Sequence, residues 1–254
     1  ANATQMMFFH ECLSGIVSRA AKDGYSVLVC MTESGDNEIL KSVLENGKVD
    51  AVILTQLKHD DKNVALVSEY EIPFVIIGSG SLEGAVYVDS RMKDNCAEFT
   101  RLCAKNLGED GNVLFVCGSL DVEANNNRLS GFLSGMESIK EKSLNYAVCT
   151  DSSDIEDEVF LKNWNLILCS DDVVCVQVLE ILNGKGIEAG KDIKIASFHD
   201  SILLQSHLPP ISALQVNAFS LGTVSAELSL KALRRDVYEK VNYVDCSFAM
   251  RESV

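Results

Sequence analysis

Between Asn165 and Ala213 the chain places a helix pattern between two apolar runs, and this order constrains the fold more than any other feature. The run Leu166–Cys169 is continuously apolar, which is typical of a strand that is buried on both faces. Ser170–Asp172 supplies residues that favour a helix start, and apolar residues then recur at helical spacing until Gly184. Ile193–Ala196 is the second apolar run. The stretch therefore predicts a parallel βαβ unit whose loops gather at the carboxyl ends of its strands.

The same alternation of short apolar runs and helical patterns continues along most of the chain. Further strands are expected at residues 26–31, 51–55, 74–77, 85–88, 113–117, 145–148, 212–216 and 245–250. Helices are expected at residues 8–20, 38–45, 64–70, 95–107, 128–139 and 221–233. Strands that alternate with helices form parallel sheets covered by helices, so the sequence predicts an α/β fold.

A polar turn with two glycines, Gly108–Gly111, interrupts this pattern and is the expected joint between two doubly wound parallel-sheet lobes. A chain of 254 residues is long enough for two lobes of roughly 100–150 residues each. The last helix is expected to return to the first lobe, and the last strand to end in the second. We therefore expect an N-terminal lobe of residues 1–110 plus 217–236, and a C-terminal lobe of residues 111–216 plus 237–254.

The charge balance excludes two classes of partner. The chain has 22 basic and 37 acidic residues, and its net charge of −15 repels phosphate backbones and anionic membrane surfaces. No apolar stretch approaches the roughly 20 residues that a membrane-spanning helix needs. We therefore expect no membrane partner, and no binding of nucleic acid by this chain alone.

The nine cysteines indicate the cellular compartment. Cys30, Cys117, Cys149 and Cys169 lie within apolar strand runs, where cysteine acts as a small apolar residue. Unpaired buried thiols are typical of a reducing cytoplasm, which is the expected location. The sequence has no Cys-x-x-Cys pair, and its four histidines are dispersed, so neither a metal site nor a cofactor is expected.

An ordered series of short segments carries a resemblance to a known family. The segments are Phe8-Phe9 followed by LSGI, Val49–Leu54, Ile72–Val75, Arg128–Phe132, Cys169–Val174, Ile193–Asp200, Leu208–Ile211, Leu221-Gly222 and Arg251–Ser253. In this order they resemble the effector domain of lactose-repressor and galactose-repressor-like transcription regulators. The resemblance covers essentially the whole chain. Two consecutive prolines and the Arg-Glu-Ser ending favour a regulator over the related periplasmic sugar-binding proteins of uptake systems, which are the alternative.

The resemblance implies a bilobed fold of the periplasmic-binding-protein type I, with a ligand cleft between the lobes. It implies a small-molecule effector, which is a sugar, a sugar phosphate or a nucleoside-like compound, and usually a homodimer. Relatives also carry an amino-terminal helix-turn-helix for DNA binding, which this chain lacks. The chain begins just after the position of the family's first strand, so we expect it to be part of a longer protein. Effector binding is expected to alter the dimer geometry.

Two candidate ligand-binding residues belong to the expected second lobe. Arg128 matches an arginine that the family places at the start of a helix facing the cleft, and its planar fork can bind two ligand oxygens. The alternative is a solvated helix arginine. Asp171 matches a position where relatives accept hydrogen bonds from sugar hydroxyls, but a helix N-cap requires the same residue.

His199 is the informative departure from the family, because relatives usually carry an aspartate there. A histidine can donate hydrogen bonds as well as accept them, so the effector can differ from a simple hexose. Asp200 is the second acidic position of this rim, and capping of the short turn that follows is the favoured interpretation over a ligand contact. Ser170 can add a hydroxyl to the same rim, with capping of the turn as an equal alternative.

The expected first lobe supplies three further candidates. Phe8 and Phe9 match an aromatic pair that stacks on the flat face of a ligand in relatives, although Phe8 also fits the buried face of its helix. Arg91 could point toward the same crevice, and an exposed surface arginine is the alternative.

An enzymatic function has weaker support. Ser170, Asp171 and His199 are the residue types of a catalytic triad, but their spacing gives no reason to prefer that arrangement. The sequence therefore predicts no enzyme and no catalytic residues.

Overall fold

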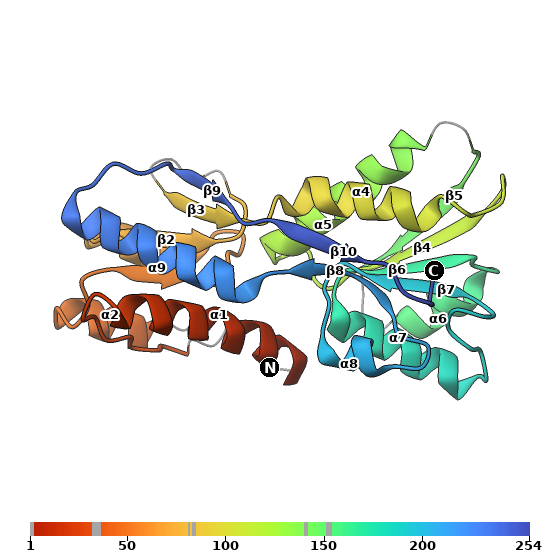
Figure 1. Ribbon diagram of the computed structural model, residues 1–254, viewed down its shortest axis with the longest axis horizontal. Helices are drawn as coiled ribbons and strands as arrows, with labels where there is room; N and C mark the ends of the chain where they lie inside the picture. Colours follow the sequence, from red (N-terminus) through yellow and green to blue (C-terminus); the bar gives the residue numbers. More distant parts are fainter. Residues whose placement is uncertain (1–2, 32–36, 81, 83–84, 140–141, 151–153) are drawn as a thin grey trace. The chain divides into compact units, whose positions relative to one another are not determined.

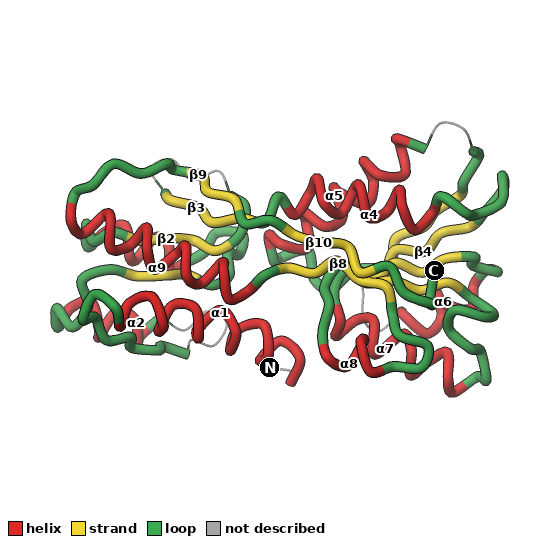
Figure 2. Tube along the Cα trace, in the orientation of Figure 1, coloured by secondary structure: helices red, strands yellow, loops and turns green. Residues whose placement is uncertain are grey.

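Two separate sheets organise the chain, and each is the centre of its own unit. The computed structural model describes residues 3–31, 37–80, 82, 85–139, 142–150 and 154–254. Unit 1 comprises Ala1–Met7, Arg91–Val216 and Asp245–Val254, and unit 2 comprises Phe8–Ser90 and Asn217–Val244. The predicted α/β class is confirmed (Figure 1, Figure 2).

Unit 1 contains a six-stranded sheet in the order β10-β8-β7-β6-β4-β5. The strands are β4 (Asn112–Val116), β5 (Asn145–Cys149), β6 (Leu166–Cys169), β7 (Lys194–Ser197), β8 (Ser212–Val216) and β10 (Cys246–Ala249). Only β10 runs antiparallel to its neighbour. The helices are α4 (Met92–Ala104), α5 (Glu123–Ser138), α6 (Ile155–Leu161), α7 (Asp172–Gly184) and α8 (Ile202–Ser206).

Strand β6 shows why an apolar run becomes a central strand. All four of its side chains are fully buried, and alternate ones point to opposite faces of the sheet. Ile167 packs in the cluster that contains Val178 of α7. Leu168 packs on the other side in the cluster that contains Phe99 of α4 and Phe132 of α5. Helices therefore cover both faces, which is the three-layer arrangement of a doubly wound sheet (Figure 1).

Unit 2 contains a four-stranded parallel sheet in the order β1-β2-β3-β9. Its strands are β1 (Val52–Leu54), β2 (Phe74–Ile77), β3 (Val86–Asp89) and β9 (Val241–Tyr243). Its helices are α1 (Ala3–Ala21), α2 (Glu38–Glu45), α3 (Lys62–Glu69) and α9 (Ala218–Arg234). Helix α9 contacts β2 and β3, and Val64 of α3 packs with Ile76 and Tyr87 of the sheet.

The predicted strand at residues 26–31 is wrong. These residues form no strand, and Leu28, Val29 and Met31 are 55%, 51% and 72% exposed. An apolar run forms a strand only where a neighbouring strand supplies hydrogen-bond partners, and β1 is the edge of the described sheet with β2 as its neighbour.

The boundary between the two units differs from the expected boundary between the lobes where the chain first crosses it. The chain enters unit 1 at Arg91 instead of near Gly108–Gly111, because α4 packs against α5. Close packing is possible at Gly131 and Gly135, where a Cβ atom would lie 2.5 Å from the Lys93 carbonyl oxygen and 2.7 Å from that of Ala97. Strand β9 belongs to unit 2 instead of the expected C-terminal lobe, because it pairs with β3. The short elements α6, α8 and β9 were not predicted from the sequence.

Candidate functional site

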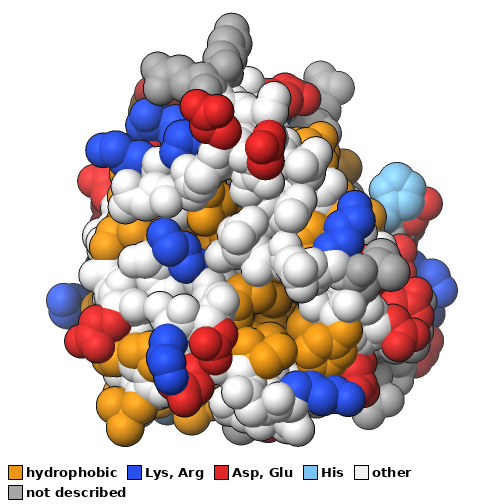
Figure 3. Space-filling model, turned by 90° about the vertical axis from the view of Figure 1, so that its right-hand side faces the viewer, with side chains coloured by type: hydrophobic (Ala, Val, Ile, Leu, Met, Phe, Trp, Pro, Cys, Tyr) orange, Lys and Arg blue, Asp and Glu red, His pale blue; other side chains and the backbone are white. Residues whose placement is uncertain are grey.

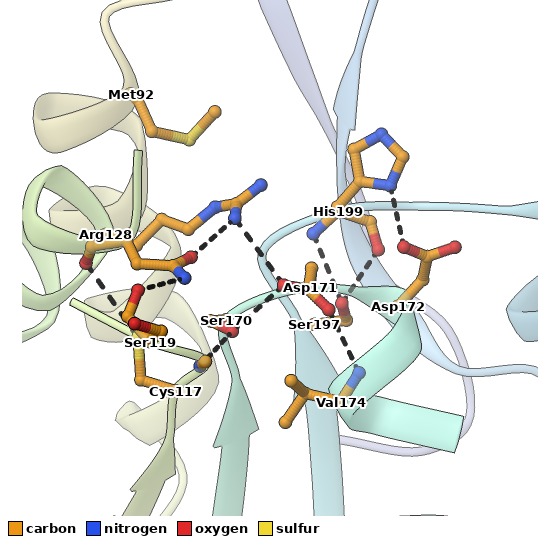
Figure 4. A network of polar contacts seen from close by, with 12 residues as sticks. Met92, Cys117, Ser119, Arg128, Ser170, Asp171, Asp172, Val174, Ser197 and His199 are labelled. Carbon is orange, nitrogen blue, oxygen red and sulfur yellow. Dashed lines mark hydrogen bonds and ion pairs between the residues drawn. The ribbon is translucent and has the colours of Figure 1, made fainter. Parts of the chain in front are cut away.

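Polar side chains of unit 1 gather where three neighbouring parallel strands end. Strands β4, β6 and β7 lie side by side, so the residues that follow them meet at one edge of the sheet. Ser170–Asp172 follows β6 and His199 follows β7. Arg128 reaches the same edge from α5 (Figure 4). We call Arg128, Ser170, Asp171, Asp172 and His199 the carboxyl-edge cluster.

Asp171 is both the N-cap of α7 and the acceptor at the centre of the cluster. Its Oδ1 accepts a hydrogen bond of 3.0 Å from the backbone N–H of Val174. Its Oδ2 accepts one of 3.2 Å from the Ser170 hydroxyl. Ser170 is fully buried and its Oγ also accepts from the Gly118 N–H at 3.2 Å. Ser170 therefore orients Asp171, and a ligand contact by Ser170 stays a prediction.

Arg128 faces this acceptor. Its Nη1 lies 3.6 Å from Oδ2 of Asp171 and donates a 2.9 Å hydrogen bond to Oδ1 of Asn125. Asn125 is held in turn by its own donation to the Ser119 carbonyl at 2.9 Å. The Arg128 side chain is only 14% exposed, and its buried Nε has no hydrogen-bond partner among the described residues. It is therefore not the solvated helix arginine that was the alternative.

His199 is fixed at both its backbone and its ring. The backbone N–H donates to Oγ of Ser197, and that hydroxyl donates to the His199 carbonyl. The ring Nδ1 lies 3.2 Å from Oδ1 of Asp172, and the two side chains are 12% and 4% exposed (Figure 4). Asp172 is the residue that sequence reasoning missed. The acidic pair Asp171-Asp172 could have indicated it, but its burial could not be foreseen.

The expected role of Asp200 as a cap for the following turn is wrong. Ser201 is the N-cap of α8, and Asp200 instead accepts two hydrogen bonds from the guanidinium of Arg251, at 2.9 Å and 2.5 Å. Gln205 and Gln215 donate to the same carboxylate. Burial would raise the pKa of Asp200, but the bonds from Arg251 and Gln215 outweigh it and hold the pKa below its ordinary range. Asp200 is therefore structural.

Three ligand-binding candidates, Arg91, Phe8 and Phe9, remain to be located in the structure. Arg91 belongs to unit 1, not to the expected first lobe, and is an exposed residue with a left-handed φ of 50° at the N-cap of α4. Phe8 and Phe9 belong to unit 2, where their rings meet edge to face with centroids 5.7 Å apart. Phe9 is 37% exposed and Phe8 is partly buried. Ligand contacts by these three residues stay predictions.

The thiols near the cluster are not suited to nucleophilic chemistry. All nine cysteines are free, and burial raises the pKa of the Cys117 thiol to about 11. Within the described ranges, no group of three or more His, Cys, Asp or Glu side chains could hold a metal ion. The same part of the chain has no helix that is both long and apolar enough to cross a bilayer.

Comparison with known proteins identifies a family and several relatives. A family model described as the periplasmic binding protein-like domain matches residues 112–254. The HTH-type transcriptional repressor PurR of Haemophilus influenzae is 23% identical over 240 residues, which are 89% of this chain and 70% of that protein. The HTH-type transcriptional regulator RegA of Clostridium saccharobutylicum is 21% identical over 252 residues, with 93% and 74% covered.

Solved structures show the same fold. A transcription regulator-like protein from Staphylococcus haemolyticus matches with a TM-score of 0.87 and 24% identity, over 97% of this chain and 91% of that one. A periplasmic binding protein/LacI transcriptional regulator from Alkaliphilus metalliredigens, solved with D-xylulofuranose, matches with a TM-score of 0.79 and 19% identity, over 97% and 94%. The predicted periplasmic-binding-protein type I fold is confirmed by these likenesses.

Proposed function

The chain belongs to the family of periplasmic binding protein-like domains, as an effector domain of the lactose-repressor and galactose-repressor type, and we propose that it senses a sugar or sugar derivative. The observation that carries this proposal is the carboxyl-edge cluster. It presents a guanidinium, a carboxylate and an imidazole at the end of three parallel strands, where α/β sheets bind ligands.

The chemistry of the cluster suits a small molecule rich in hydroxyl groups. A sugar hydroxyl both donates and accepts, so it can donate to Asp171 while it accepts from Arg128. The complex of the Alkaliphilus metalliredigens protein with D-xylulofuranose supports this class of effector, since that protein shares the fold. A sugar phosphate or a nucleoside-like compound is a further member of the proposed class.

DNA binding is proposed to depend on a separate domain of the regulator. The net charge of −15 repels DNA, and Figure 3 shows acidic and basic side chains interspersed on the face that it draws. Curated relatives of the chain carry HTH in their names, which supports a helix-turn-helix as that domain. Nine free cysteines support a place in the reducing cytoplasm.

We propose that the regulator is a homodimer whose geometry responds to the effector. In unit 1, Ile202 and Leu203 of α8 and Leu208 beyond it are 51%, 49% and 87% exposed. Apolar side chains grouped in this way are typical of surfaces that pair with another chain. Effector binding can change the dimer only through different affinities for its two geometries. Analytical ultracentrifugation is expected to show a dimer that Leu203→Asp with Leu208→Asp weakens.

A thermal-shift panel tests the proposed function. The panel comprises D-ribose, maltose, cellobiose, D-xylulose, glucose 6-phosphate, adenosine and hypoxanthine. A compound at 100 times its Kd stabilises the folded state by about 2.7 kcal/mol, so a true effector gives a clear rise in Tm. Arg128→Ala is expected to abolish that rise, while Arg101→Ala, an exposed arginine of α4, is expected to keep it. An unchanged rise with Arg128→Ala would show that the proposed site is wrong.

A further inference from the structure

Asp172 is buried more deeply than its position in the helix requires. It is the first residue of α7, where a negative side chain interacts favourably with the positive end of the helix dipole. This interaction does not require the side chain to be buried. The N-cap bond is already made by Asp171. The Asp172 side chain is nonetheless 4% exposed, and its Oδ2 has no hydrogen-bond partner among the described residues.

A buried carboxylate is costly unless a partner compensates for the lost water. The partner that the structure provides is the ring of His199, whose Nδ1 lies 3.2 Å from Oδ1 of Asp172. An ionised carboxylate only accepts hydrogen bonds, so Nδ1 must carry the proton in this contact. In the neutral imidazole the other nitrogen, Nε2, is then an acceptor.

Charged groups from two helices lie at the same edge of the sheet as the His199 ring (Figure 4). Asp172 comes from α7, Asp171 caps the same helix, and Arg128 comes from α5, where it lies 3.6 Å from Asp171. Figure 4 shows the Arg128 guanidinium and the His199 ring on either side of Asp171. Among the described residues, this edge therefore holds one cationic donor, the carboxylates of Asp171 and Asp172, and one oriented imidazole.

We propose that Asp172 is a positioning residue for effector recognition. It holds His199 as the Nδ1-protonated tautomer, so that Nε2 accepts a hydrogen bond from a hydroxyl or N–H group of the effector. The inference rests on the proposed function for the identity of the site. It adds a residue to the site and a requirement on the ligand, which must present a donor to His199 while it presents an acceptor to Arg128.

The tautomer can be measured without an effector. Long-range ¹H–¹⁵N NMR of the full chain at alkaline pH, where imidazoles are neutral, distinguishes the two tautomers. The chain has four histidines, and the His199 signals are assigned by their loss in His199→Gln. We expect Nδ1–H in the wild type. In Asp172→Asn the amide can donate to Nδ1 as well as accept from it, so the population of the Nε2–H form is expected to rise.

Two controls keep this test independent of folding and of the proposed function. Glu180→Gln, at an exposed residue of α7, is expected to leave the tautomer of His199 unchanged. Asn has the size of Asp, and circular dichroism is expected to show a folded Asp172→Asn variant. Nε2–H at His199 in the wild type, or a population of Nε2–H that does not rise in Asp172→Asn, overturns the inference whatever the ligand panel shows.

Binding then tests the consequence for recognition. For the panel compound that stabilises the wild type, we expect about tenfold weaker binding by Asp172→Asn, which is the loss of one good hydrogen bond. Wild-type affinity in Asp172→Asn, together with a lost response in Arg128→Ala, overturns the inference and leaves the proposed function standing. A panel in which no compound stabilises the wild type counts against the proposed function, and the NMR result still decides the role of Asp172.

Discussion

Nη1 of Arg128 lies 3.6 Å from Oδ2 of Asp171, and the two side chains are 14% and 17% exposed. Hydrogen bonds fix both side chains: Arg128 donates to Asn125, and Asp171 accepts from the Ser170 hydroxyl and from the Val174 N–H at the start of α7. Groups held in this way lose little freedom when a ligand binds, and a preorganised site binds more tightly for that reason. A cationic donor and an anionic acceptor are therefore displayed at a fixed separation.

Arg128→Lys tests the geometry of this pair at constant charge. Lysine keeps the positive charge but loses the planar fork that binds two oxygens at once. We expect the affinity for the panel effector to fall about tenfold or more, measured by isothermal titration calorimetry. Arg101→Lys, at an exposed arginine of α4, is the matched control. If Arg128→Lys bound the effector as the wild type does, the fork would have no role in recognition.

Most of the fold could be predicted because periodicity and burial act locally. The run at 166–169 and the helix after it were predicted because a strand buried on both faces is continuously apolar. The strand at 26–31 was predicted wrongly because pairing depends on a neighbour, which local sequence does not report. The joint at Arg91 was missed because glycines far along the chain, Gly131 and Gly135, let α5 approach α4.

The site was predicted less completely than the fold. Arg128, Asp171 and His199 were predicted as ligand-binding residues through the family resemblance, and the structure gathers them at one edge of the sheet. Asp172 was missed because its partner, His199, lies 27 positions further along the chain. The role of Asp200 was misjudged for the same reason, since Arg251 lies 51 positions away. Contacts between distant residues leave no trace in local spacing.

Asp200→Asn tests the ion pair with Arg251. The Asp200 side chain is 5% exposed, and removing its charge leaves Arg251 without its anionic partner. Loss of one partner of a buried pair costs about 3 kcal/mol of unfolding free energy at neutral pH. Urea denaturation at pH 7 measures this loss, with Asp192→Asn, at an exposed aspartate, as the control. A variant as stable as the wild type would contradict a stabilising role.

The pH dependence of the same variant follows from the lowered pKa of Asp200. The folded pKa lies below the ordinary value of 3.8, so the contribution to stability is present above that value and is lost as the pH falls through the folded pKa. Wild type and Asp200→Asn are therefore expected to converge in stability under acid conditions. A gap of constant size between pH 7 and the acid limit of folding would refute this linkage.

Ser253→Ala tests the attachment of the chain end to the sheet of unit 1. The fully buried Ser253 hydroxyl accepts from the Ser212 N–H at 2.8 Å and donates to the Ile195 carbonyl at 2.7 Å. Alanine leaves both backbone groups buried without this partner, at a cost of about 1–3 kcal/mol for an unsatisfied group. Denaturation midpoints measure the loss. Ser247→Ala, at a more exposed hydroxyl, is expected to change little, and equal effects of the two changes would contradict the argument.

Gly222→Ala tests the packing of α1 against α9 in unit 2. A Cβ atom at Gly222 would lie 2.0 Å from the Cys12 carbonyl oxygen, and one at Gly15 would lie 2.1 Å from that of Phe219. Both obstacles are backbone atoms, so the helices would have to move apart. Overpacking of this kind costs about 1–3 kcal/mol or more, against at most about 1 kcal/mol gained from the helix propensity of alanine.

The matched control for this change is Gly184→Ala at the end of α7, where a Cβ atom would have nothing within 4 Å. The two substitutions add the same methyl group to helical glycines, so only the neighbouring backbone differs. We expect Gly222→Ala to lower the Tm by several degrees, since 1 kcal/mol corresponds to about 2–4 °C in a protein of this size. Gly184→Ala is expected to match or exceed the wild type. A Tm for Gly222→Ala at or above that of the wild type would mean that α1 and α9 are not packed as closely as described.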